Sequence, residues 1–184
     1  MSQNQERRTI HRRFSDRRVA LMLAVHEILF DDPPGERRER RLLDALMYDY
    51  QTARAAFVTR EAGASELRLS RTGGEWGGDP EGRPLDGAGV AALLDVHRIA
   101  TGAVTLTYVR RPSQFEREAW EELWSGGLGA PATALISVEL KPERAPGGFL
   151  WLAEASSSRE WSSGDRELIE EVGGLLSRAA DKEA

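Results

Sequence analysis

The chain has 184 residues, of which 40% are hydrophobic and none is cysteine. This length suits one ordinary domain with a short appendage, and the composition is that of a globular protein. The lack of cysteine excludes disulfides, thiolate metal sites, a cysteine nucleophile and any cofactor attached through a thioether. The longest apolar run, 19–30, contains His26 and Glu27 and is shorter than the ~20 residues that a membrane span needs. We therefore expect a cytoplasmic protein with no membrane span.

Charge is distributed unevenly along the chain. The formal net charge is −5. The first eighteen residues carry six arginines against Glu6 and Asp16, a net +4, and the remaining 19 basic and 28 acidic side chains leave −9. An acidic body disfavours a nucleic-acid surface, because such surfaces neutralise phosphates with Lys and Arg. The basic leader, residues 1–17, is interpreted either as a flexible, solvated terminus or as a contact for an acidic signalling partner.

Two helices are predicted after this leader. Apolar residues recur with helical spacing from about Ser15 to Phe30, and two prolines and a glycine in 31–35 must end that helix. A second helix is expected over about 36–52. Its first turns carry arginines where the helix dipole disfavours cations, which indicates acidic groups nearby. These arginines are Arg37, Arg38, Arg40 and Arg41.

A hairpin and a long loop follow. Residues 55–59 are typical of a buried strand, and 66–70 alternate between apolar and polar, as a strand with one solvated face does. The segment 72–86 contains five glycines, two prolines and Trp76. A loop of this length and composition in a compact domain is usually either a functional flap or poorly ordered.

The remaining pattern predicts an α+β sandwich. In chain order it indicates a helix over 90–100, a strand over 104–109, a helix over 113–125, strands over 133–140 and 148–155, and a helix from Ser162 or Ser163 to about 181. The last two strands are apolar on both faces, which places them centrally in the sheet. Short turns between strands imply antiparallel pairing rather than a doubly wound parallel sheet.

The C-terminal third resembles the GAF domain family. The similar stretches are 147–153 (GGFLWLA) and 159–169 (REWSSGDRELI), which match the family's ending of a glycine before an apolar strand, an aromatic, a Ser/Thr and an Asp, and a closing helix. The resemblance implies one domain over 18–181, with an antiparallel sheet of five to six strands. It further implies terminal helices on one face of that sheet and helices and loops on the other. A PAS domain is the nearest alternative, but it seldom closes with a long helix.

The resemblance implies a small-molecule site, and the residues restrict its chemistry. Bilin attachment and methionine-sulfoxide reduction in this family use cysteines, which the chain lacks. Trp161 and Asp165 match the Phe and Asp of the cyclic-nucleotide set, but Arg166 replaces its Glu and no Asn-Lys precedes it. We expect no resident cofactor.

Candidate pocket residues are mainly aromatic. They are Trp76, His97, Tyr108, Trp120 and Trp124. His97 lies where haem-binding relatives supply an axial ligand, although a lone histidine at helical spacing from apolar residues is more often a packing residue. Trp120 and Trp124, one turn apart, could line an aromatic pocket, but such a pair is more often part of the core. No metal-ligand spacing and no catalytic constellation occurs, so we expect no enzyme.

The sequence therefore predicts a non-catalytic signalling module that binds a small molecule or a partner and forms a homodimer through its first and last helices. A ligand would change the packing of the loop 72–86 over the sheet, and the terminal helices would transmit the change. The candidate interface residues are Met22, Val25, Leu29, Ile169, Val172 and Leu176. The alternative is a ligand-free adaptor whose pocket is filled by its own tryptophans.

Overall fold

The structure, a computed structural model, places six strands and three helices in the described part of the chain. That part comprises 3–60, 66–74, 76, 81–85, 104–108, 132, 134–154 and 161–184, without the side chains of 3–14, 105, 107 and 108. The elements are α1 (Gln3–Asp31), α2 (Glu36–Tyr50), β1 (Arg54–Arg60), β2 (Leu67–Gly74), β3 (Pro84–Leu85), β4 (Val104–Tyr108), β5 (Ala134–Leu140), β6 (Gly148–Glu154) and α5 (Ser163–Glu183). The helices predicted over 90–100 and 113–125 lie outside the described residues.

The strands form one antiparallel sheet in the order β3-β2-β1-β6-β5-β4. This confirms the α+β class and the antiparallel sheet of five to six strands. Both C-terminal strands lie inside the sheet, as predicted: β6 is central, between β1 and β5, and β5 lies between β6 and the edge strand β4. Every residue of β6 is buried, whereas the last two residues of β5 are partly exposed. A strand buried on both faces has to be apolar throughout, as β6 nearly is.

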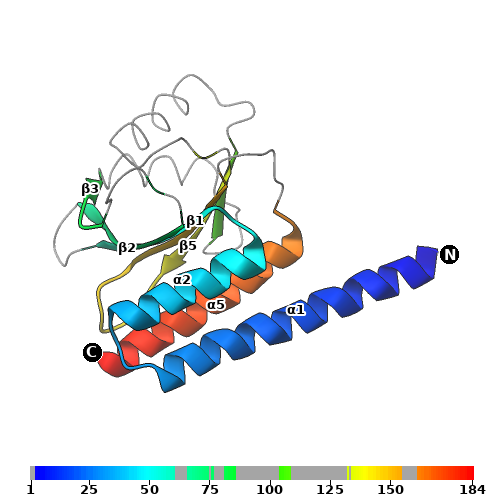
Figure 1. Cartoon of the computed structure of the whole chain (residues 1–184), viewed down its shortest axis with the longest axis horizontal. Helices are drawn as coiled ribbons and strands as arrows, with labels where there is room; N and C mark the ends of the chain where they lie inside the picture. Colours follow the sequence, from blue (N-terminus) through cyan, green and yellow to red (C-terminus); the bar gives the residue numbers. More distant parts are fainter. Residues whose placement is uncertain are drawn as a thin grey trace.

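All three described helices cover the same face of the sheet (Figure 1). α2 and α5 pack directly on the strands, and α1 lies against α2 and α5. Leu43 and Leu46 of α2, Ile169 and Val172 of α5, and Val25 of α1 are each fully buried in the core between these layers. Toward its N-terminus α1 continues beyond the other two helices (Figure 1).

Two boundaries differ from the sequence prediction. α1 begins at Gln3 rather than near Ser15. Residues 3–14 are polar and have no apolar period, so the periodicity does not indicate a helix there. Gln, Glu and Arg are nevertheless good helix formers. β2 continues to Gly74, where a loop was expected. A Cβ on Gly73 would lie 3.2 Å from the Cβ of Leu43, so this glycine lets α2 approach the strand closely. Glycines that indicate a loop in the sequence here serve helix–sheet packing.

Three of the four arginines that open α2 have acidic partners, as the sequence predicted. Arg38 donates to Glu183 over 2.5 and 2.7 Å, and Arg41 donates to Asp32 over 2.5 Å. Arg40 forms ion pairs with the carboxylates of two residues, Glu36 and Glu81. These ion pairs compensate for cations at the positive end of the helix dipole.

Arg17 joins the three helices at one point. Its Nε donates to Asp49 of α2 over 2.8 Å, and its Nη1 donates to Asp165 of α5 over 2.6 Å. The guanidinium carbon lies 4.9 Å from the centre of the Tyr50 ring, a cation–π distance. The Tyr50 hydroxyl in turn donates to the backbone oxygen of Asp165 over 2.8 Å. One half-buried cation thus holds α1 against both other helices.

Asp165 also caps α5. The helix begins with a capping box in which Ser162, rather than Ser163, is the N-cap residue and Asp165 is its N3 partner. Burial by itself would raise the pKa of Asp165, but hydrogen bonds from Arg17 and Ser162, together with the Arg17 charge, lower it below its usual 3.8. The folded state therefore favours the ionised carboxylate.

Stability should depend on the charge of Asp165. A depressed folded-state pKa contributes stability that is complete above the unfolded-state value and is lost as the pH falls through the folded-state value. Asp165→Asn should lower the free energy of unfolding by about 1–3 kcal/mol at pH 7. The difference in the free energy of unfolding between wild type and variant, measured by urea unfolding, should become smaller as the pH falls below 3.8. A difference that stays constant from pH 7 to pH 3 would contradict this assignment.

Gly173 and Gly174 provide a matched test of the α5–sheet contact. A Cβ on Gly173 would lie 2.7 Å from Cγ2 of Val138 in β5, whereas one on Gly174 would meet only the end of the Arg178 side chain, at 3.4 Å. Gly173→Ala should destabilise the protein by about 1–3 kcal/mol through overpacking. Gly174→Ala should be neutral or stabilising by up to about 1 kcal/mol, because alanine favours helix. Urea unfolding measures both, and equal effects would show that the close contact is unimportant.

Candidate functional site

A second apolar core lies on the sheet face that points away from the helices. Because side chains alternate across a strand, every other residue faces this side. The core comprises Ala56, Val58, Leu67, Leu69, Leu85, Ala132, Leu135, Phe149, Trp151 and Ala153, with Trp76 packed against it. We call this side of the sheet the distal face.

Two polar groups are buried on the distal face. Ser137 of β5 and Trp151 of β6 are register partners, so their side chains lie next to each other on the same side of the sheet. Each residue is 1% exposed. Among the described residues neither the Ser137 Oγ nor the Trp151 Nε1 has a hydrogen-bond partner. A buried polar group without a partner costs about 1–3 kcal/mol, so this pair is where a ligand's polar atoms would be stabilised.

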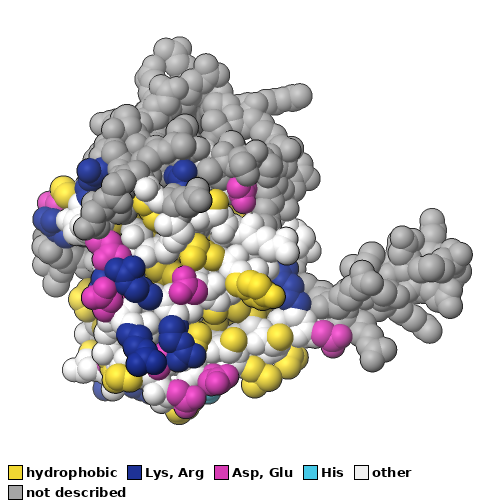
Figure 2. Space-filling view, in the orientation of Figure 1, with side chains coloured by type: hydrophobic (Ala, Val, Ile, Leu, Met, Phe, Trp, Pro, Cys, Tyr) yellow, Lys and Arg dark blue, Asp and Glu magenta, His cyan; other side chains and the backbone are white. Residues whose placement is uncertain are grey.

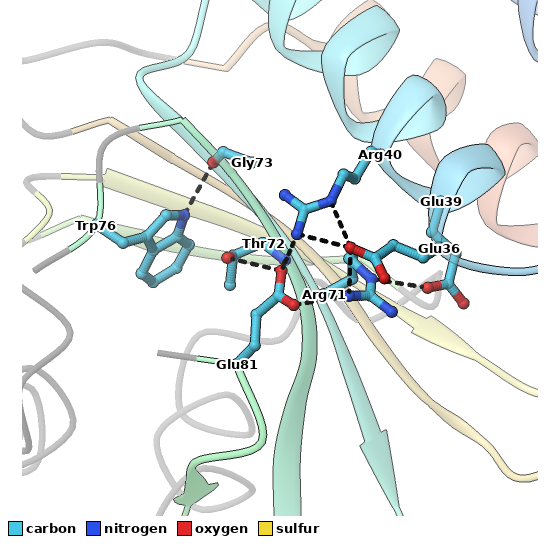
Figure 3. Close-up of polar contacts among 8 residues, drawn as sticks. All are labelled: Glu36, Glu39, Arg40, Arg71, Thr72, Gly73, Trp76 and Glu81. Atoms are coloured by element: carbon cyan, nitrogen blue, oxygen red, sulfur yellow. Dashed lines mark hydrogen bonds and ion pairs between the residues drawn. The ribbon is translucent and has the colours of Figure 1, made fainter. Parts of the chain in front are cut away.

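Trp76 covers another part of the distal face. Its Nε1 donates to the backbone oxygen of Gly73 over 2.8 Å, which fixes the ring beside the end of β2 (Figure 3). The guanidinium carbon of Arg54, from the first position of β1, lies 5.8 Å from the centre of the Trp76 ring. The indole therefore has a hydrogen bond and a cation contact, and it packs against the second core.

A charged network connects the segment before β3 to α2 (Figure 3). Glu81 accepts hydrogen bonds from the Thr72 backbone N–H over 3.0 Å and from Arg71 Nη1 over 2.7 Å. Arg71 also donates to Glu39 of α2 over 3.1 Å. Burial tends to raise the pKa of Glu81, but the Thr72 N–H and the charges of Arg71 and Arg40 outweigh this and lower it. A change in the position of Glu81 would thus alter contacts of α2.

The predicted pocket residues are only partly described. Trp76 lies on the distal face, and the backbone of Tyr108 ends β4 at the other side of the sheet. Three strands separate β2 from β4 in the sheet, and a common pocket for Trp76 and Tyr108 stays a prediction. His97, Trp120 and Trp124 lie outside the described residues, and their place in a pocket stays a prediction.

The predicted interface residues lie mainly inside the single chain. They are Val25, Ile169, Val172 and Leu176, which are buried in the core beneath the helices, and Met22 and Leu29, which are partly buried against it. The large apolar side chains exposed on α1 are instead Val19, Leu23 and Phe30, at 58%, 65% and 73%. Figure 2 shows hydrophobic side chains exposed on the helical side of the molecule, among Arg and acidic residues. The apolar residues of α1 therefore occupy two faces, and the sequence period does not tell which of them packs inside.

Sequence reasoning also missed the buried polar pair. Ser137 is the one hydroxyl residue in the strand ALISVEL, and Trp151 is the one residue with a polar side-chain atom in FLWLA. A polar group inside a strand buried on both faces was the available signal. The described residues contain no group of three or more His, Cys, Asp or Glu side chains that could hold a metal ion. No helix in the described part of the chain is long and apolar enough to cross a membrane.

Comparisons of the sequence and comparisons of the fold with known proteins give different results. No protein-family model matches the sequence. No curated protein matches it either.

Solved structures with the same architecture are numerous. The phycoerythrobilin-bound GAF domain of a cyanobacterial phytochrome is similar with a TM-score of 0.71 at 10% identity, covering 91% of this chain and 96% of that one. The nlh2 GAF domain of A. aeolicus in an inactive state gives 0.64 at 16% identity, covering 93% and 99%. The GAF domain of a putative sensor histidine kinase from Pseudomonas syringae pv. tomato gives 0.59 at 13%, covering 97% and 95%. The chain therefore adopts a GAF-like fold.

Proposed function

We propose that this protein is a cytoplasmic, non-catalytic sensory module that binds a small molecule on the distal face and responds through its helices. The proposal rests on two neighbouring buried polar atoms, Ser137 Oγ and Trp151 Nε1. Neither atom has a hydrogen-bond partner among the described residues. Solved neighbours with this fold include bilin-bound domains and a domain of a putative sensor kinase. A thioether-linked bilin is excluded here by the absence of cysteine, so the ligand would be held non-covalently.

The Glu81 network supports a response through the helices. Glu81 forms ion pairs with Arg71 of β2 and with Arg40 of α2, and Arg71 also contacts Glu39 of α2. Leu85 of β3, which follows Glu81 in the chain, belongs to the second core on the distal face. α2 in turn shares Arg17 with α1 and α5 through Asp49. A ligand that displaces the 81–85 segment would change this chain of ion pairs. Coupling of this kind requires that the ligand bind the two arrangements with different affinity.

The exposed face of α1 supports a homodimer. Four of its exposed residues, Val19, Leu23, His26 and Phe30, follow one another at spacings of four, three and four residues. This is the spacing of a coiled-coil seam. The rings of His26 and Phe30 stack with their centres 4.8 Å apart, which gives the seam a continuous aromatic patch at one end. We propose that this face, rather than the buried residues of α1 and α5, contacts the second copy.

An adaptor without a ligand is the second candidate. The Trp76 indole is already hydrogen-bonded to Gly73 and packed on the distal face, as expected if the chain's own tryptophans fill the pocket. Such an adaptor would bind proteins through its acidic body or through the basic residues that begin α1. The two candidates differ in whether a small molecule occupies the distal face.

Native mass spectrometry with an absorbance scan of the freshly purified protein tests the ligand. We expect a co-purifying small molecule whose retention falls about tenfold in Trp151→Phe, since removal of one hydrogen bond to a ligand costs about 1–2 kcal/mol. Trp161→Phe is the matched control, because Trp161 is buried on the helical face. A bare protein mass in wild type, with no response of tryptophan fluorescence to a metabolite library, would favour the adaptor.

Light scattering at about 100 μM tests the dimer, since a transient association in the micromolar range is populated there. Wild type should be a dimer, and Leu23→Glu should be a monomer because it places a charge in an apolar seam. Tyr48→Glu is the control, since Tyr48 of α2 is even more exposed, at 87%, but lies outside the seam. A monomeric wild type, or dissociation in Tyr48→Glu alone, would refute the α1 interface.

A further inference from the structure

A cavity lies on the helical side of the sheet, opposite the distal face. Its volume is about 190 Å³. Apolar side chains from α2, β1 and α5 form much of its wall, among them Leu42, Phe57 and Leu176, and the turn that begins β6 closes one side. Arg38 and Glu183 both line it. The cavity thus combines an apolar wall with one buried cation.

Arg38 is the unusual member of this lining. The residue is only 9% exposed, and burying a guanidinium is costly unless the charge is paired. Its two terminal nitrogens donate to the two carboxylate oxygens of Glu183 over 2.5 and 2.7 Å. The Nε is buried and has no hydrogen-bond partner among the described residues. The cation is therefore enclosed, while its acidic partner, 31% exposed, comes from the last turn of α5.

The arrangement resembles a carboxylate-binding site occupied by the protein's own side chain. An arginine fork binds a carboxylate through two parallel hydrogen bonds, so another carboxylate could replace that of Glu183 in the same geometry. Glu39 also lines the cavity, and Arg38 is the one cationic side chain among the described residues of its wall. A phosphate dianion would therefore lack sufficient compensating charge, which favours a monoanion.

The size of the cavity limits the rest of the molecule. A volume of about 190 Å³ corresponds to about six waters at ~30 Å³ each, which suits an acid of about four to six carbon atoms. We propose that this cavity binds a short-chain monocarboxylic acid, whose carboxylate replaces that of Glu183 on Arg38 and whose alkyl chain lies against Leu42, Phe57 and Leu176. The site is independent of the distal-face ligand proposed above.

Binding would have a structural consequence for α5. Glu183 lies in the helix's last turn, and Asp181 in the same turn accepts a hydrogen bond from the backbone N–H of Arg144 over 2.7 Å. Displacing Glu183 removes the contact that joins this turn to α2. The acid would therefore loosen the C-terminal turn of α5 from the helix layer, while the Arg17 junction at the other end of α5 remains intact.

Titration of the full chain with hexanoate, followed by amide NMR shifts, tests this site. Hexanoate should shift signals around Arg38, and hexanol, which lacks the carboxylate, should not. Glu183→Gln should bind hexanoate about tenfold more tightly, because the competing charged hydrogen bonds are weakened. Arg38→Gln should abolish binding. Arg41→Gln is the matched control, because Arg41 belongs to the same helix but pairs with Asp32, and it should bind as wild type does.

A second variant keeps the test valid if Arg38→Gln does not fold. Ala180 lines the cavity from α5, so Ala180→Leu should fill it and prevent binding while leaving the Arg38–Glu183 pair in place. Absence of hexanoate shifts in Glu183→Gln, equal binding of hexanol, or unchanged binding in Ala180→Leu would each overturn the proposal. Trp151→Phe should leave hexanoate binding unchanged, so failure of the distal-face ligand and failure of this site are distinguishable.

Discussion

The guanidinium of Arg17 is shared between two carboxylates, Asp49 and Asp165, that come from different helices. α1 lies on α2 and α5, so its hold on the domain depends on apolar contacts and on this cation. Asp165 is also the N3 residue of the capping box that begins α5. The same carboxylate therefore determines where α5 starts and how α1 lies on it, and its low pKa reflects both roles.

The two faces of the sheet are packed differently. The helical face is closely packed where Gly173 lies against Val138 and a larger residue would collide, and it holds the cavity beside Arg38. The distal face holds a second apolar core with a polar pair, Ser137 and Trp151, inside it. Glu81, just before β3, forms ion pairs with Arg71 of β2 and Arg40 of α2, and Leu85 of β3 belongs to the second core. Displacement of β3 would therefore alter the contacts of α2.

Ion pairs in this fold connect residues far apart in sequence. Arg38 and Glu183 lie far apart in the sequence, yet they form a bidentate ion pair beside a cavity. The arginines at the start of α2 indicated that acids lie nearby, but which acids these are depends on where α5 and the segment before β3 are placed. An exposed pair contributes little to stability. A pair around a buried arginine is different, because its removal leaves an uncompensated charge.

The sequence alone determined the order of the described elements except β3, the antiparallel sheet and the central position of β6, since these follow from local periodicity and short connections. It also excluded thiol chemistry, because no cysteine is present. Only the tertiary structure decided which face of α1 is buried, so that Val25 lies in the core and Leu23 is exposed. It likewise placed Gly73 in a strand and left Ser137 with Trp151 inside an apolar face. Periodicity is a property of neighbouring residues, whereas burial depends on which distant surfaces meet.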